Sequence, residues 1–440
     1  MTHSQNIPDY TVNTKWQDIF LVLLGLLGVS FLTLFFFNHE FSHLIMSGSL
    51  IEFSFNKFST FLGSIFCLSL FIGIFPVRKE NEITKSFIFY ILGGLGIILS
   101  NNLITFFLFW TFQRSLPAFR FIRGIRNQST SGGGTYLVQH FITFACLIVL
   151  TVLASRSGYA SLSFSQIPAS FFTWPVLILS FVIIFESHGI FPFHSWIHDL
   201  VGNINWYKIS TIFLARAGVL LFVKLIMPTI DQDPGFFKIV LLSLSIFSSI
   251  YWSVRGIFET NVAKITTYFY VAQSSLILSG LLADRAAAHG SYLQILVISL
   301  SGTALWSLMS YIQRHTSIKR LNQFYGLAQF YPKLATLFCL FGFSMIGTPL
   351  GAAFVVEDLV INGLLDQQPF LGLGHILATC LNGILFFLIF SKLFLGQTAY
   401  PQKIKNLDMS LGQMIPYVLI LFVMFLIGIF PSLFLRNITW

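Results

Sequence analysis

Apolar stretches of about twenty residues recur along the whole chain, and short polar segments separate them. Coiled as a helix, each stretch is long enough to cross the roughly 30 Å hydrocarbon core of a bilayer. A helix also satisfies its own backbone polar groups, which water cannot reach there. The pattern predicts an all-α integral membrane protein of about thirteen transmembrane helices. They are expected near residues 17–37, 58–76, 86–100, 102–118, 135–154, 172–193, 207–228, 238–258, 266–284, 292–312, 333–364, 372–396 and 413–435.

The composition excludes a soluble globular protein. Hydrophobic residues make up 55% of the chain and charged residues 9%, whereas soluble domains carry about a quarter charged residues. The first apolar run, Trp16 to Phe37, is too long for a signal-peptide core, and no small-residue cleavage site follows it. We therefore expect it to remain as a helix in the mature protein.

The net charge of +9 follows the predicted topology. If the N-terminus is cytoplasmic, eighteen of the 25 lysines and arginines lie at the cytoplasmic ends of the predicted helices, among them Arg114. Five lie at the other ends: Lys57, Arg156, Lys238, Arg285 and Arg436. A positive excess on the cytoplasmic side is typical of multi-pass proteins. We predict a multi-pass protein of the cell (inner) membrane, with a cytoplasmic N-terminus and an outside C-terminus, that contacts membrane lipid and not nucleic acid.

The predicted loops are short. The longest, near residues 115–134 and 313–332, are too short to fold as separate domains. Residues 1–440 are therefore expected to form a single transmembrane domain.

Two of the predicted helices contain the same kind of interruption. The first runs from Glu186 to His194 and the second from Gly342 to Gly351, and each combines glycine and proline with nearby ionisable residues. Proline removes a backbone donor and glycine frees the chain, so the helix can open beside a charge. A pair of such breaks, one in each half of a membrane protein, indicates a transport pathway near the bilayer midplane. A simple proline kink without a transport role is the alternative.

Several ionisable residues fall inside predicted helices, where a charge costs roughly 2.5 to 3.5 kcal/mol and normally marks an ion pathway. They are Glu186, His188, Arg216, Lys224, Glu357 and Asp358. Arg216 and Lys224 are eight residues apart, which places them on nearly one helix face. An acid on a broken helix is expected to pair with a base on its neighbour. For Lys224, an extended side chain that reaches the interface is the alternative.

Three histidines lie close together around the first break: His188, His194 and His198. Imidazole exchanges protons near neutral pH, which suits an entry or exit path for protons. The alternative is that they are hydrogen-bonded packing groups.

The segment from His39 to His43 matches the HExxH pattern, which on a helix places two histidines around zinc. It follows the first predicted helix without an obvious third ligand, so we predict no metal site. No phosphate-binding glycine loop is recognisable, and we predict no cofactor and no catalytic residue. The expectation is a transporter subunit and not an enzyme.

Three ordered segments resemble the antiporter-like membrane subunits shared by respiratory complex I, Mrp sodium/proton antiporters and DAB-type inorganic-carbon complexes. They are Phe191 to Asp199 with the following Arg216 and Lys224, Asn261 to Tyr268, and Gly347 to Glu357. The resemblance covers about residues 86–365 and leaves 1–85 and 366–440 as flanking helices. It implies two inverted five-helix repeats, each with a broken helix, and a chain of buried charges across the membrane centre.

The resemblance is incomplete at three positions where the family carries a charged residue. The expected glutamate is Thr111, the lysine of the first broken helix is Ser187, and a later lysine falls near Trp306. Glu186 and His188 flank the vacant lysine position and are candidates to replace it. The Phe-Pro-Phe-His sequence at the first break is most similar to the DAB-type complexes, which implies a soluble, zinc-containing, carbonic-anhydrase-like partner on the cytoplasmic side.

The leading hypothesis is a membrane subunit that lets protons or another cation cross, coupled to a partner and serving inorganic carbon (CO2 or bicarbonate) uptake. Glu357 and Asp358 would exchange protons, Arg216 and Lys224 would tune them electrostatically, and the three histidines would connect them to the cytoplasm. One alternative is a non-conducting scaffold that anchors a soluble enzyme, which the missing charges favour. Another is a subunit of a respiratory NADH:quinone-type or Mrp-type complex, with other membrane subunits as partners. A redox subunit holding haem or quinone would need paired helical histidines at ligand spacing, and the sequence lacks them.

Overall fold

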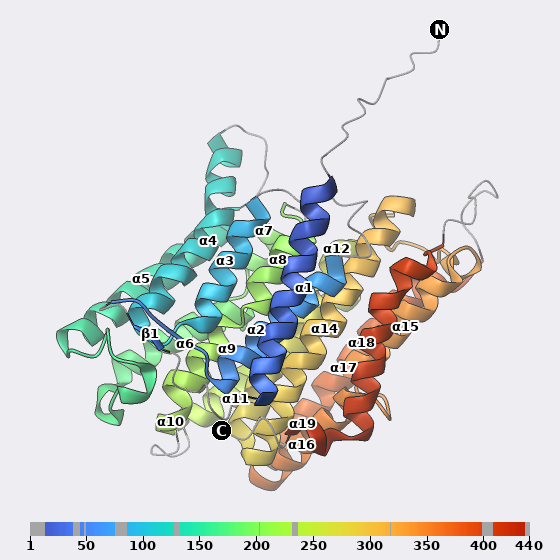
Figure 1. The fold of residues 1–440 in the computed structure, drawn as a ribbon. Coiled ribbons are helices and arrows are strands. Elements are labelled where there is room, and N and C mark those ends of the chain that lie inside the picture. Colours follow the sequence, from blue (N-terminus) through green and yellow to red (C-terminus); the bar gives the residue numbers. More distant parts are fainter. Residues whose placement is uncertain are drawn as a thin grey trace.

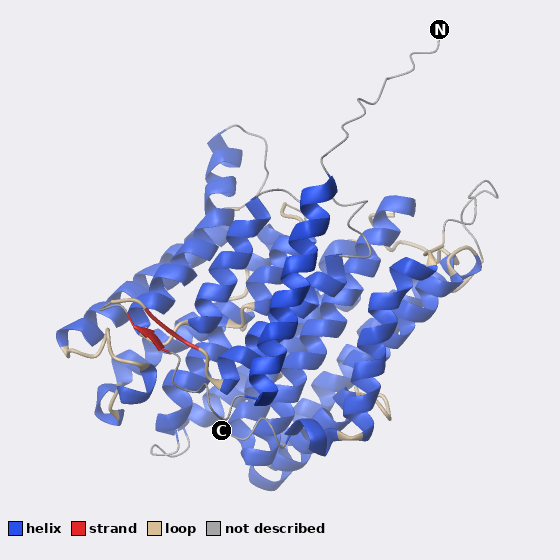
Figure 2. Cartoon of the chain, in the orientation of Figure 1, coloured by secondary structure: helices blue, strands red, loops and turns tan. Residues whose placement is uncertain are grey.

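The computed structural model describes residues 14–37, 45–47, 50–74, 86–126, 133–201, 203–230, 236–316, 318–397 and 408–435. Within these ranges the chain is almost entirely helical (Figure 2). The elements are α1 (Thr14–Phe37), β1 (Ile45–Ser47), β2 (Glu52–Ser54), α2 (Lys57–Ile74), α3 (Ser86–Leu99), α4 (Leu103–Arg126), α5 (Gly134–Arg156), η2 (Phe164–Gln166), η3 (Ala169–Phe171), α6 (Trp174–His188), α7 (Trp196–Leu200), α8 (Trp206–Leu214), α9 (Ala217–Leu221), the π-helical η4 (Phe222–Ile226), α10 (Met227–Ile230), α11 (Phe236–Phe258), α12 (Val262–Ser275), α13 (Ile277–Ala283), α14 (Arg285–Thr316), η5 (Leu327–Gln329), α15 (Pro332–Met345), α16 (Ala352–Gln367), α17 (Pro369–Phe394), α18 (Leu411–Ile429) and α19 (Pro431–Leu435).

The long helices run side by side as one bundle, with α1 starting at the upper end and α19 at the lower end of the view (Figure 1). Strands β1 and β2 form a short antiparallel hairpin in which Ile45 pairs with Ser54 and Ser47 with Glu52. Figure 2 shows the hairpin at one edge of the bundle. The bundle is thus a set of helices with a minor β-hairpin between α1 and α2.

Nine helices of the described part are long and apolar enough to cross a membrane. Three shorter apolar helices add to them, at Phe87–Leu99, Trp174–His188 and Pro332–Met345. The prediction of an all-helical membrane protein is confirmed, whereas the number of thirteen spans and the two inverted repeats stay predictions. Two of these shorter helices end inside the predicted interruptions, α6 at His188 and α15 at Met345.

The centre of the bundle is formed by α12, α13 and α14. The most apolar 18-residue stretches of Val262–Ala283 and Arg285–Thr316 are fully buried, whereas only 22% of the corresponding stretch of Gly134–Arg156 is buried. Small residues of α14 permit close approach: a Cβ at Gly302 would lie 2.3 Å from the Tyr270 ring of α12. Glycine and serine at helix interfaces give membrane helices this closeness, because hydrophobicity does not drive helices together in lipid.

Three of the predicted helices differ clearly from the structure in length or continuity. The expected loop at 115–134 is wrong over its first half, because α4 continues to Arg126. Helix α14 likewise runs from Arg285 to Thr316, beyond both predicted ends. The cause is the same: charged residues end an apolar run, but a helix continues past the hydrocarbon into the interface. The expected single helix at 207–228 is divided into α8, α9, η4 and α10.

Candidate functional site

The first predicted break is present and begins after α6. Gly189 adopts the left-handed conformation with φ 66° and closes the helix. The backbone carbonyls freed there are partnered by indoles, since Trp196 Nε1 donates to the Glu186 carbonyl at 3.0 Å and Trp252 Nε1 donates to the Gly189 carbonyl at 2.8 Å. The Phe191–Pro192 peptide bond that follows is cis. The break is thus built from paired backbone groups next to a carboxylate.

Glu186 forms an ion pair with Arg114 of α4. Arg114 Nη1 lies 3.4 Å from Glu186 Oε1, and both side chains are 1% exposed. The guanidinium also lies 4.7 Å from the centre of the Trp196 ring, and the Tyr136 hydroxyl donates to the Arg114 carbonyl. Our placement of Arg114 among the surface charges was wrong, because α4 carries it into the interior. The acid on the broken helix does pair with a base, but that base comes from α4 and not from the helix after the break.

The members of this pair are close in sequence to two positions at which the family resemblance led us to expect charges. Arg114 follows Thr111 by three residues, which places both on one side of α4. Glu186 directly precedes Ser187, whose hydroxyl donates to the Ile183 carbonyl. The base therefore lies on α4 and the acid on α6, the reverse of the arrangement implied by the resemblance.

Arg216 lies at a second irregularity, where α8 gives way to α9. Its φ of 49° is left-handed, which is rare for a residue with a side chain and costs about 1 to 3 kcal/mol. The guanidinium is buried and donates to Ser274 Oγ at 2.6 Å, to the Tyr270 hydroxyl at 3.0 Å and to Ser299 Oγ at 3.0 Å. A fixed positive charge is thus held by neutral hydroxyl groups of α12 and α14.

Trp306 supports this arrangement from α14. Its ring stacks on Tyr270 with centroids 4.3 Å apart and also contacts Phe213. At a position where a lysine was expected, an aromatic ring therefore fixes the tyrosine that binds Arg216.

Lys224 contacts a different part of the bundle. Its Nζ donates to Ser59 Oγ at 3.0 Å and to the Ser100 carbonyl at 2.8 Å. The expected shared face of Arg216 and Lys224 is wrong, because the chain is irregular at Arg216 and the π-helical turn of η4 rotates the residues that follow.

The three histidines separate into two groups. His188 is buried, with Nδ1 3.2 Å from the Ile184 carbonyl, and it lies so close to α9 that a Cβ at Gly218 would be 2.5 Å from its ring. The rings of His194 and His198 have centroids 6.5 Å apart, and His198 Nδ1 is hydrogen-bonded to the Tyr268 hydroxyl. The structure thus brings His194 and His198 together and places His188 beside α9, the helix that follows Arg216.

The segment after the first break is anchored by Asp199. Its carboxylate accepts hydrogen bonds from Thr135 Oγ1 and from the backbone N–H of Tyr136, both in the first turn of α5. A carboxylate at this position accepts hydrogen bonds from free N–H groups and interacts favourably with the positive end of the helix dipole. Asp199 therefore connects the broken helix to α5.

The second predicted break separates α15 from α16. Gly347, with φ 74°, and Leu350, with φ 71°, both adopt the left-handed conformation. The half-buried carboxylate of Glu357 lies directly against Gly347, where a Cβ would be 2.3 Å from Glu357 Oε2. Asp358 is exposed and accepts a hydrogen bond from Asn362 Nδ2 at 3.1 Å. The two neighbouring acids therefore have different surroundings.

No group of three or more His, Cys, Asp or Glu side chains that could hold a metal ion is found within the described ranges. The motif from His39 to His43 lies outside the described residues.

Four residues of this site were missed from the sequence: Arg114, Tyr270, Ser274 and Ser299. Arg114 could have been found, because it falls inside the helix predicted at 102–118, where a charged side chain costs free energy and usually has a function. The hydroxyl residues had none, since serine and tyrosine are common in spanning helices and only the fold turns them toward Arg216.

Helices broken at glycine, with ionisable side chains held at the breaks, define a polytopic membrane protein with a polar interior. The sequence pattern of the NADH:quinone oxidoreductase/Mrp antiporter transmembrane family matches residues 100–382. The chain belongs to this family.

Individual relatives agree with this assignment. The chloroplastic NAD(P)H-quinone oxidoreductase chain 4 of Glycine max is 24% identical over 456 residues, which cover 95% of this chain and 90% of that protein. A chain in the structure of the Mrp complex from Dietzia sp. DQ12-45-1b has a similar fold, with a TM-score of 0.82, 15% identity and coverage of 96% and 91%. A chain of respiratory complex I from Thermus thermophilus has a TM-score of 0.79, 18% identity and coverage of 95% and 92%. These similarities support the family as a whole and do not support its DAB-type member.

Proposed function

We propose that this chain is a proton- or cation-translocating membrane subunit of a larger complex. The observation that carries the proposal is the enclosed Arg114–Glu186 ion pair at the broken end of α6. Charges inside a membrane domain are costly and usually serve transport. The names of the relatives, quinone oxidoreductase and Mrp complexes, support coupling to other membrane subunits.

The ion pair provides a way to couple proton movement to a change in structure. Two enclosed charges stabilise each other, and removal of either partner leaves the other unpaired at a cost of about 3 to 5 kcal/mol. Separation of Arg114 from Glu186 therefore favours proton uptake by the carboxylate, and return of Arg114 favours release. Glu357 is the corresponding acid at the second break, and Arg216 is a fixed positive charge between the breaks in sequence. We place the exit toward the cytoplasm at His194 and His198, and the two breaks in two inverted repeats.

An exchange of charges tests the pair. Arg114→Glu and Glu186→Arg alone each place two like charges together, and we expect translocation to fall more than tenfold. The double variant restores an opposite pair and is expected to recover most of the activity. Proton flux is measured with a pH-sensitive dye in membrane vesicles that contain the full chain with its native partners, and exposed Arg120→Glu is the control. Full activity in either single variant would remove the pair from the mechanism.

Two other hypotheses give different results in the same vesicles. A non-conducting scaffold predicts no flux that depends on Arg114, Glu186 or Glu357, with the complex still assembled. The second hypothesis is that the chain serves inorganic carbon uptake together with a soluble, zinc-containing partner. Its only basis is the sequence from Phe191 to His194. Purification of the complex followed by zinc, flavin and iron analysis separates this purpose from quinone-linked respiration.

A further inference from the structure

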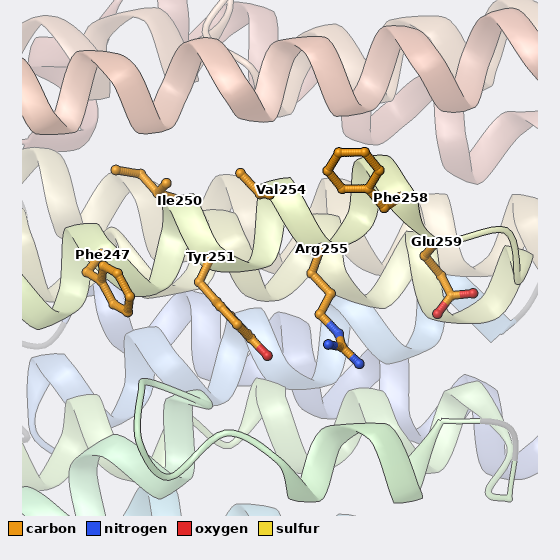
Figure 3. Close-up of a pocket in the computed structure, with 7 residues that line it drawn as sticks. All are labelled: Phe247, Ile250, Tyr251, Val254, Arg255, Phe258 and Glu259. Atoms are coloured by element: carbon orange, nitrogen blue, oxygen red, sulfur yellow. The ribbon is translucent and has the colours of Figure 1, made fainter.

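A surface groove follows the last three turns of α11 and encloses about 530 Å³. Its seven lining residues all belong to α11 or to the residue after it, and they form two rows at a spacing of four (Figure 3). One row is apolar: Ile250, Val254 and Phe258. The other becomes polar toward the helix end: Phe247, Tyr251, Arg255 and Glu259. Adjacent rows at this spacing leave a channel between them along a helix surface.

The groove is open to the outside of the bundle. Phe258 is 81% exposed, Phe247 48% and Val254 38%. In Figure 3 Tyr251, Arg255 and Glu259 point to one side of α11, and Ile250, Val254 and Phe258 point to the other. An apolar channel that ends in polar groups on a single helix has the form of a site for an amphiphile.

The polar end of the groove carries net positive charge. Arg255 is exposed, and Lys264 lies near enough to Glu259 to act on it electrostatically. The Glu259 carboxylate is the only acid in the groove lining, and it accepts hydrogen bonds from the backbone N–H groups of Thr260 at 2.9 Å and Asn261 at 3.0 Å. Arg255 and Lys264 both act electrostatically on Glu259, and Arg255 is also hydrogen-bonded to the Tyr268 side chain. Two basic side chains beside one carboxylate leave one positive charge in excess, which attracts an anion.

The depth of this charge agrees with a lipid headgroup. Helix α11 has 23 residues and is therefore about 34 Å long, slightly more than the hydrocarbon core of a bilayer. Arg255 is in its last turn. In a helix that spans the bilayer, we expect this position at the level of the headgroups, and Phe247 and Ile250 deeper, at the level of the acyl chains.

We propose that this groove binds an anionic phospholipid, with its phosphate at Arg255 and an acyl chain along Ile250, Val254 and Phe258. The bound lipid borders the first break, because the Tyr251 ring lies 4.7 Å from His194 by centroid distance. The proposal stands apart from translocation, since it concerns the outer surface of α11.

Lipid retention measured by native mass spectrometry on the purified full chain tests the site. We expect the wild type to retain phosphatidylglycerol over phosphatidylcholine and Arg255→Gln to retain about fivefold less phosphatidylglycerol, since one basic residue near a membrane contributes about that factor. Val254→Trp fills the channel without a change in charge and is expected to weaken retention as well. Arg285→Gln removes an exposed arginine outside the groove and is the matched control.

Four results would overturn the proposal. Equal retention of the two lipids by the wild type would show that no anion is selected. Equal losses in Arg255→Gln and Arg285→Gln would show binding to surface charge in general, and normal binding by Val254→Trp would place the lipid elsewhere. A cysteine at Val254 that crosslinks to a second polypeptide in native membranes would identify the groove as a protein interface. None of these results depends on whether the chain translocates ions.

Discussion

The carboxylate of Glu357 lies against the α-carbon of Gly347, so the acid of α16 occupies the space where any other residue at the break would have a side chain. Only glycine both adopts φ 74° without strain and leaves that space open. The position of the Glu357 carboxylate therefore depends on glycine at residue 347.

Gly347→Ala is expected to destabilise the protein by about 1 to 3 kcal/mol, because it adds left-handed strain and displaces the Glu357 carboxylate. Thermal unfolding followed by tryptophan fluorescence measures the loss. Gly383→Ala in α17 is the control, since nothing lies within 4 Å of its new methyl group. An equal melting temperature for the two variants would contradict the close contact.

Glu357→Gln is expected to abolish translocation while leaving assembly of the complex intact, because the amide fills the same space but exchanges no proton. Asp358→Asn changes an exposed acid on the next position of the same helix and is expected to retain at least half of the flux. Vesicle proton flux measures both variants. Full activity in Glu357→Gln would remove this residue from the pathway.

Arg216→Lys keeps the charge but loses the fork that reaches Ser274, Tyr270 and Ser299 together. We expect translocation to fall about tenfold or more, since each hydrogen bond from a charged group contributes about 1.5 to 3 kcal/mol. Exposed Arg156→Lys is the matched control. If Arg216→Lys has wild-type flux, the point charge alone suffices and the hydroxyl shell serves only packing.

Asp199→Ala removes the side chain that caps α5. The expected loss of stability is about 0.5 to 2 kcal/mol, the usual cost of losing an N-terminal cap. Asp358→Ala, on an exposed face, should leave the melting temperature near that of the wild type. Glutamine or asparagine at 199 retains one acceptor, so Asp199→Asn is expected to fall between Asp199→Ala and the wild type.

The helical class and both breaks followed from the sequence because apolar length, glycine and proline act locally. Glu186 and Glu357 were found for the same reason, as acids inside apolar runs. The partner of Glu186 was not, because Arg114 comes from a helix 72 positions earlier in the chain, and contacts at such separation depend on packing. The kink at Arg216 was also missed, because no proline lies near it and Gly218, two residues later, lies within the apolar run.

Helix α14 connects the surroundings of both acids. Ser299 holds Arg216 near one break, and Gly290 packs against Val356 and Val360 beside Glu357 at the other. Nine residues separate these two points on α14, about 14 Å along a rigid rod. A shift of α14 along its axis would therefore move both contacts together. A structural change at one break would then be transmitted to the other break through the helix itself, without transfer of an ion between them.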